Sequence, residues 1–245
     1  MQKELKIELL FYIITFLLFF MKSFFKILVF TIITTQLNYA QKTFENEFGS
    51  WYMLNHTLKT SNKIDVISGL QIHDFKVFDN MNLWFFYAGA NYHLNKTTTI
   101  TLAHCFLDID KTFATNGDNH LFENRPYLQL KHKNTSSKLH LNHRFRYEIR
   151  LLNYKGTHNT LHRFRYRLAH KKNLNKLLFV TVSNEIFANL KGALFTENRF
   201  YFALGFNVSK SNNIQIGYLN HEINNMNLNR LQISFNIKTN LVNAK

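Results

Sequence analysis

Strict alternation of polar and apolar side chains over long stretches is the feature that most limits how this chain can fold. The clearest stretch is residues 139–150, LHLNHRFRYEIR, where Leu141 and Phe145 fall on one face and Arg144 and Arg146 on the other. Because successive side chains of a β-strand point to opposite faces, this spacing predicts one long two-faced strand. A helix would scatter the arginines around its circumference.

The same alternation continues from residue 42 almost to the C-terminus, and a second HRFRY pentapeptide stands at 162–166. The alternating segments run for roughly ten to fourteen residues, whereas strands of soluble proteins usually have about five or six. A tilted strand that crosses a bilayer needs about nine to eleven residues. Length and alternation together predict an all-β fold, a transmembrane antiparallel β-barrel of about ten to twelve strands.

The number and connection of these strands can be counted from the sequence. Eleven segments begin near residues 44, 63, 82, 97, 121, 137, 158, 176, 195, 212 and 228. An antiparallel barrel with both chain ends in the periplasm needs an even number of strands, so ten or twelve remain, and we expect twelve. Short polar connections alternate with longer ones, which predicts periplasmic turns and outer loops. The short set is 59–62, 94–98, 133–137, 171–176 and 209–213, and the longer set includes 108–124, 152–159, 188–198 and 221–229.

The N-terminal region has the parts of an export signal. Basic residues, an apolar run and a small residue, Ala40, follow Met21 in turn. This order is typical of a secretory signal peptide, so we expect residues 1–40 to be removed and residues 41–245 to form the barrel domain in the outer membrane.

A second apolar run in residues 1–20 precedes this signal. We interpret it as a start of translation assigned too early, with Met21 the true start. The alternative is a membrane anchor over residues 9–37. Charged residues interrupt that stretch, which argues against one spanning helix of about twenty residues.

The alternating arginines must face the lumen of such a barrel, because a charge on the lipid side at the bilayer midplane costs about 2–4 kcal/mol. Buried charges have to be paired, and the planar guanidinium group can hold a carboxylate through two hydrogen bonds. Glutamates share the lumen register. Glu185 and Arg199, which flank 188–198, are expected to form an ion pair, and the alternative is a recessed polar pocket below that loop. Cations outnumber carboxylates, so the surplus would repel cations or attract anions. The predicted lumen charge network consists of Glu123, Arg125, Arg144, Arg146, Glu148, Arg150, Arg163, Arg165, Arg167, Glu185, Glu197, Arg199 and Arg230.

Other functions that a basic chain suggests are disfavoured. The formal net charge is +15, and arginines alternate with aromatic residues, as in grooves that bind nucleic acid. The export signal separates the chain from nucleic acid, so no such partner is expected. The twelve histidines form no same-face cluster with carboxylates, and the single cysteine, Cys105, excludes a cysteine-based site. We therefore expect neither a metal nor another cofactor.

An outer-membrane enzyme is the main alternative to a barrel without catalytic activity. Barrel hydrolases place a serine and a histidine together near the outer rim. Here Ser183 and Ser234 are predicted to face the lumen, and Ser50 and Ser68 have no evident histidine partner. No catalytic residue is therefore assigned.

Several segments in a fixed order carry a resemblance to a known family. They are FGSWYMLN at 48–55, HRFRYEIR at 143–150, HRFRYRL at 162–168, SNEIFANL at 183–190 and FTENRFYFALGFNVSKSNNIQIGYLN at 195–220. Together they resemble an uncharacterised Gram-negative family, domain of unknown function 2490, over residues 41–240. The resemblance implies an exported outer-membrane β-barrel, and it implies no activity.

The sequence thus predicts an outer-membrane barrel with an Arg/Glu-packed lumen that is either structural or a narrow, anion-preferring pore. Expected partners are outer-membrane lipid, the barrel assembly machinery and, for a pore, a small anionic solute. Two alternatives remain open. One is a barrel enzyme that acts on lipid or lipid-linked glycan, and the other is a surface-binding protein that uses the loops at 108–124 and 188–198.

Overall fold

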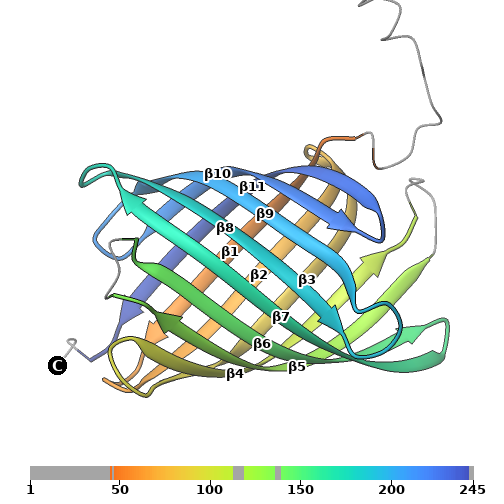
Figure 1. Ribbon diagram of the computed structural model, residues 1–245, viewed down its shortest axis with the longest axis horizontal. Coiled ribbons are helices and arrows are strands. Elements are labelled where there is room, and N and C mark those ends of the chain that lie inside the picture. The colour runs from red at the N-terminus through yellow and green to blue at the C-terminus, as the bar shows by residue number, and fades with distance from the viewer. Residues whose placement is uncertain (1–44, 46, 113–118, 136–138, 243–245) are drawn as a thin grey trace, which may run out of the picture. The chain divides into compact units, whose positions relative to one another are not determined.

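The computed structural model describes residue 45 and residues 47–112, 119–135 and 139–242. These residues form β-strands that join edge to edge into a closed barrel (Figure 1). The strands are β1 (Gly49–Lys59), β2 (Ile64–Lys76), β3 (Asp79–His93), β4 (Thr98–Asp110), β5 (His120–Lys133), β6 (Leu141–Tyr154), β7 (Thr157–Asn173), β8 (Leu178–Asn189), β9 (Phe195–Asn207), β10 (Asn213–Ile223) and β11 (Met226–Asn240). The expected signal peptide and its boundary at residue 40 lie outside the described residues.

No helix within the described ranges is long and apolar enough to cross a lipid bilayer.

The barrel closes through one parallel pair of strands, β1 with β11, and every other neighbouring pair is antiparallel. The parallel register runs from Gly49 opposite Arg230 to Lys59 opposite Asn240. This closure allows an odd number of strands, so the count of eleven segments is confirmed and the expected total of twelve is wrong. Because β1 and β11 run in the same direction, the start of β1 and the end of β11 lie at opposite rims and an even number of strands is not required.

A ladder of side-chain amides crosses the parallel seam on the lumen side. Asn55 Nδ2 donates to Asn236 Oδ1 at 3.0 Å, and Asn236 Nδ2 donates to Asn213 Oδ1 at 3.1 Å. The Tyr87 hydroxyl donates to Asn55 Oδ1 at 2.9 Å. Parallel pairing is slightly weaker per residue than antiparallel pairing. These bonds link β10, β11 and β1 around the seam, and the Tyr87 side chain reaches across β2 to join β3 to them.

The odd-numbered strands end at one rim, here called the turn end. Its connections are 60–63, 94–97, 134–140, 174–177 and 208–212. Four of these turns share one design, in which a side-chain oxygen accepts the backbone N–H groups two and three residues further on. The four acceptor residues are Ser61, Asn95, Asn175 and Ser209.

The even-numbered strands up to β10 end at the opposite rim, here called the loop end, with connections 77–78, 111–119, 155–156, 190–194 and 224–225. The prediction of long connections is wrong for 152–159 and 221–229, which are hairpins closed by two-residue turns. Lys155 and Gly156 have φ angles of 49° and 81°, and Asn224 and Asn225 have 49° and 66°. Positive φ at both central residues is what a type I′ turn requires. The strands therefore extend through polar sequence that hydrophobic alternation alone assigns to loops.

The outward face carries a band of exposed apolar side chains that reaches around the barrel. It includes Leu54, Leu70, Phe86, Leu102, Leu128, Phe145, Phe164, Ile186, Phe202, Ile216 and Phe235. Towards the loop end the outward positions become polar, for example Asp108, Asn198 and Glu222. A continuous apolar surface of this kind is stable in lipid and not in water, so the fold is that of a transmembrane barrel.

The substitution Phe145→Asp tests which face meets lipid. Phe145 is 49% exposed on the outward face of β6, so we expect the carboxylate to block insertion into lipid vesicles, measured as loss of the heat-modifiable folded form in gel electrophoresis. Leu174→Asp is the matched control, because Leu174 is 54% exposed in a turn outside the strands. Normal insertion of the Phe145 variant would mean that the lumen and lipid faces are reversed.

Candidate functional site

The two HRFRY pentapeptides lie side by side on β6 and β7, antiparallel to one another. Phe145 is opposite Tyr166, and Tyr147 is opposite Phe164. On the outward face the histidine of each copy bonds the tyrosine of the other: His143 Nδ1 lies 2.9 Å from the Tyr166 hydroxyl, and His162 Nδ1 lies 2.7 Å from that of Tyr147. The repeat is therefore a self-complementary unit with polar groups satisfied towards lipid and arginines turned inward.

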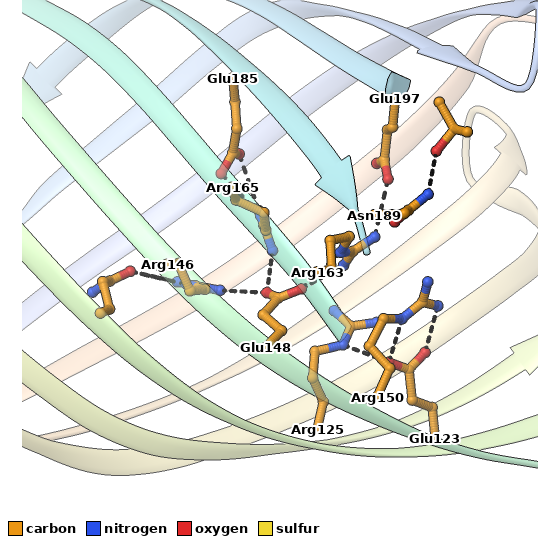
Figure 2. A network of polar contacts seen from close by, with 12 residues as sticks. Glu123, Arg125, Arg146, Glu148, Arg150, Arg163, Arg165, Glu185, Asn189 and Glu197 are labelled. Atoms are coloured by element: carbon orange, nitrogen blue, oxygen red, sulfur yellow. Dashed lines mark hydrogen bonds and ion pairs between the residues drawn. The ribbon is translucent and has the colours of Figure 1, made fainter. Parts of the chain in front are cut away.

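Glu148 is the centre of the lumen network, and its side chain is 0% exposed (Figure 2). Arg165 Nη1 donates to its Oε1 at 2.7 Å, and Arg163 Nη2 and Nε donate to its Oε2 at 2.6 and 2.9 Å. Arg146 Nη1 adds a longer bond of 3.4 Å. One buried carboxylate thus holds three guanidinium groups from β6 and β7.

One branch of the network continues from Arg165 to β8. The Nε and Nη2 atoms of Arg165 each lie 3.0 Å from a carboxylate oxygen of Glu185, which gives a bidentate pair. Arg144 Nη2 donates to the same carboxylate at 2.6 Å. Charge-assisted bidentate pairs of this type are among the stronger hydrogen bonds in proteins, so this branch ties β6 and β7 to β8.

The other branch continues from Arg163 to β9 and β10. Arg163 Nη1 donates to Glu197 Oε2 at 3.1 Å. Glu197 also forms an ion pair with Arg199 and lies 2.8 Å from His221 Nε2. The contacts from Glu148 outward therefore run without interruption from β6 to β10.

Glu123 on β5 is a second buried centre, also 0% exposed. Arg125 Nε donates to its Oε1 at 2.6 Å, and Arg150 holds both of its oxygens through Nε and Nη2 at 2.8 Å each. Arg150 comes from β6, so this group joins the two strands near the loop end.

The structure places eleven of the thirteen predicted network residues in ion pairs, and the exceptions are Arg167 and Arg230. Arg230 donates to the backbone carbonyls of Glu47 and Asn229 at 3.2 Å. Within the described ranges, Arg167 has no ion pair, and its Nε has no hydrogen-bond acceptor.

The expected ion pair between Glu185 and Arg199 is wrong. The two residues are opposite each other in the register of β8 and β9. Glu185 instead binds Arg144 and Arg165, and Arg199 binds Glu197 on its own strand. Backbone register brings the two residues alongside one another, but the long side chains reach other partners.

Aromatic side chains complete the network, and sequence reasoning missed them. Phe187 is 0% exposed, and the guanidinium groups of Arg163, Arg165 and Arg199 lie 5.0, 4.5 and 4.7 Å from its ring centroid. Arg199 is also 4.9 Å from the ring of Trp51. Cation–π contacts of this geometry stabilise desolvated arginines. The available signal was that Phe187 shares the lumen register of Glu185.

A row of cations lies across β5, β6 and β7 on the turn-end side of the network. Lys131 is opposite Arg144, and Arg144 is opposite Arg167. On the next strand, β8, the residue opposite Arg167 is Glu185, which brings a carboxylate to the end of this row. Nε of Arg144 and Nε of Arg167 are both buried without a hydrogen-bond acceptor in the described part of the chain. This row carries more positive charge than its neighbours neutralise.

A cavity of about 300 Å³ opens at the turn-end rim next to this row. Its lining includes Lys133, Asn142, Lys171 and Asn173, with His140 at the rim. Lys133 and Asn142 are paired across β5 and β6, two residues towards the rim from Lys131 and Arg144. We call the cavity and the row beneath it the basic vestibule. Its amide and ammonium groups suit a small anion.

The serines provide no assembled hydrolase site. Ser183 and Ser234 are buried in the lumen, and Ser50 Oγ is 3.3 Å from an Asp74 carboxylate oxygen. Ser68 lies opposite His56 on the outward face, a neighbour that sequence spacing did not reveal. The imidazole Nε2 of His56, however, is 3.0 Å from the Thr239 hydroxyl.

No group of three or more potential metal ligands is present in the residues that the structure describes.

The substitution Glu148→Ala tests how far the fold depends on the network. It leaves Arg163 and Arg165 buried with part of their counter-charge removed, so we expect a loss of about 3–5 kcal/mol in the free energy of unfolding in detergent, measured by urea titration. Glu222→Ala, at an exposed outward position, is the control and should change stability by less than about 0.5 kcal/mol. Equal effects of the two substitutions would show that the ion pairs do not hold the barrel together.

Comparisons with solved structures give two barrels of low sequence identity. The NanC porin, in a rhombohedral crystal form, is similar with 12% identity and a TM-score of 0.46, over 74% of this chain and 92% of the porin. The translocator domain of the autotransporter NalP from Neisseria meningitidis is similar with 11% identity and a TM-score of 0.41, over 70% of this chain and 72% of that domain.

The family comparison covers most of the barrel. No curated protein matches the chain significantly. The family described as "Protein of unknown function (DUF2490)" matches residues 48–232, from the residue before β1 into β11, and this confirms the resemblance that the motifs indicate. The chain belongs to the DUF2490 family.

Proposed function

We propose that this protein is an outer-membrane barrel that binds a small anion in the basic vestibule and whose lumen is closed to free diffusion by the Arg/Glu network. The observation that carries the proposal is the 0% exposure of Glu123 and Glu148, two charged side chains that point into the lumen. A water-filled pore would leave carboxylates on its wall in contact with water.

Closure is supported by side chains from every strand. Each strand contributes at least one buried lumen residue, and examples in strand order are Trp51, Gln71, Asn91, Thr101, Glu123, Glu148, Arg163, Phe187, Ala203, Leu219 and Arg230. Small barrels have interiors just wide enough to be filled in this way. The interior is therefore occupied by the protein's own side chains on all sides.

Anion preference is supported by the charge balance of the lumen. The predicted network contains nine arginines and four glutamates, and Lys131, Lys133 and Lys171 add to the positive side at the turn end. A positive surplus in a space with low-dielectric walls attracts anions and repels cations. Guanidinium and ammonium groups fit phosphate, sulfate and carboxylate oxygens in particular.

The outer-membrane location is supported by the closed sheet and its apolar band. A closed barrel satisfies all strand hydrogen bonds internally, which is what a β-structure needs in order to span a bilayer. The predicted export signal points the same way.

Planar-bilayer recording of the refolded chain, residues 41–245, tests closure. We expect no steady conductance from the wild type. The triple variant Glu148→Ser, Arg163→Ser and Arg165→Ser removes a central group of the network while Glu185 and Glu197 keep Arg144 and Arg199 as partners. It should show an anion-selective conductance. A steady conductance in the wild type would contradict a closed lumen, and a silent but folded triple variant would contradict closure by this group.

Thermal unfolding in detergent with inorganic phosphate tests anion binding. A ligand that binds the folded state raises the unfolding temperature, so phosphate should stabilise the wild type beyond an equal ionic strength of sodium chloride. The variant Lys133→Ala with Lys171→Ala should lose this gain. Lys63→Ala with Lys210→Ala, in turns at the same rim, is the matched control and should keep it. An equal gain in both double variants would reject the vestibule as the binding site.

A further inference from the structure

The outward surface of the barrel has a second cavity that the lumen network does not explain. It has a volume of about 410 Å³ and crosses β4 to β8. We call it the outer groove. Apolar and aromatic side chains of the lipid-facing band dominate its lining, among them Leu128, Leu130, Phe145, Phe164, Ile186 and Ala188. The groove therefore lies where the surrounding solvent is hydrocarbon.

Cationic and imidazole side chains border the turn-end side of the outer groove. His132 on β5 is opposite His143 on β6, and Leu141 is opposite His170 on β7. Lys172 follows His170 on the same face. We call His132, His143, His170 and Lys172 the outer basic rim. The described residues around it, 129–135, 139–146 and 165–173, contain no aspartate or glutamate that could neutralise its charge.

The groove and the outer basic rim are continuous along the strands. On β5, Leu130 lies next to His132 on the same face, and on β6, Phe145 lies next to His143. The His143 Nδ1 atom is bonded to the Tyr166 hydroxyl. If the tyrosine donates this bond, the imidazole proton is on Nε2, which is then a donor available to a ligand. His132 and Lys172 are exposed.

We infer that the outer groove and the outer basic rim bind one anionic phospholipid, with an acyl chain in the groove and the phosphate at His132, His143 and Lys172. An amphipathic ligand with one anionic end fits a site that is apolar along its length and cationic at one end. A juxtamembrane Lys or Arg attracts anionic lipid in the same way. This site is on the opposite face of the sheet from the lumen and is independent of the proposed anion binding in the vestibule.

Charge argues against a second copy of this chain as the occupant. Two copies related by a twofold axis present the same surface to each other. A dimer through the outer groove would therefore bring two lipid-facing surfaces with the same cationic edge together, without carboxylates from β5, β6 or β7 to neutralise it at that edge. Like charges placed together at an interface oppose association.

Native mass spectrometry of the detergent-purified protein tests this inference. The protein would be mixed with dioleoyl phosphatidylglycerol or with dioleoyl phosphatidylcholine, and the retained lipid counted. We expect the fraction of protein that retains one lipid molecule to be about fivefold larger with phosphatidylglycerol than with phosphatidylcholine. About one cation near an anionic lipid accounts for a factor of this size. Equal retention of the two lipids would overturn recognition of the anionic headgroup, and a lipid-free dimer would assign the groove to a second copy.

Two variants separate the parts of the site. His132→Asn with Lys172→Gln changes exposed side chains only and should abolish the preference for phosphatidylglycerol. His56→Asn with Lys63→Gln changes the same residue types at the same end on β1 and its turn, and should leave the preference intact. Ala188→Trp should fill the groove and reduce retention of both lipids. Wild-type retention by the first double variant and by Ala188→Trp would overturn the proposal.

Discussion

The pairing of buried charge inside the lumen is the constraint on which the rest of the structure depends. With hydrocarbon outside, every strongly charged side chain in the middle of a strand has to turn inward, and a narrow interior has to supply its counter-charge. Glu148 meets this demand for three arginines at once. A slip of β6 by one residue would carry Arg144, Arg146 and Arg150 to the lipid side, so the network and the strand register fix each other.

The inward and outward faces could be predicted from sequence because period two follows from backbone geometry alone. Which arginine meets which carboxylate could not, because that depends on strand register, tilt and side-chain reach. Glu185 is opposite Arg199 but binds Arg144 and Arg165. Strand ends were also hidden where type I′ turns such as Asn224–Asn225 let strands continue through polar sequence.

The residues that sequence reasoning missed are those whose role depends on neighbours distant in the chain. Phe187 reads as an ordinary apolar residue, and its position over three arginines from β7 and β9 emerges only when those strands pair with β8. The basic vestibule likewise combines residues of β5, β6 and β7, none of which forms a motif alone. Local pattern therefore predicted the lining of the lumen, and long-range pairing decided its chemistry.

The parallel closure has a consequence for rearranging the chain. In an all-antiparallel barrel the first and last strands can be joined by a hairpin, which makes circular permutation simple. Here the start of β1 and the end of β11 lie at opposite rims. A permutant that joins Asn240 to Gly49 would need a linker on the order of 30 Å long to travel the length of a strand. Reporter groups attached next to Gly49 and Asn240 would, for the same reason, report from opposite sides of the membrane.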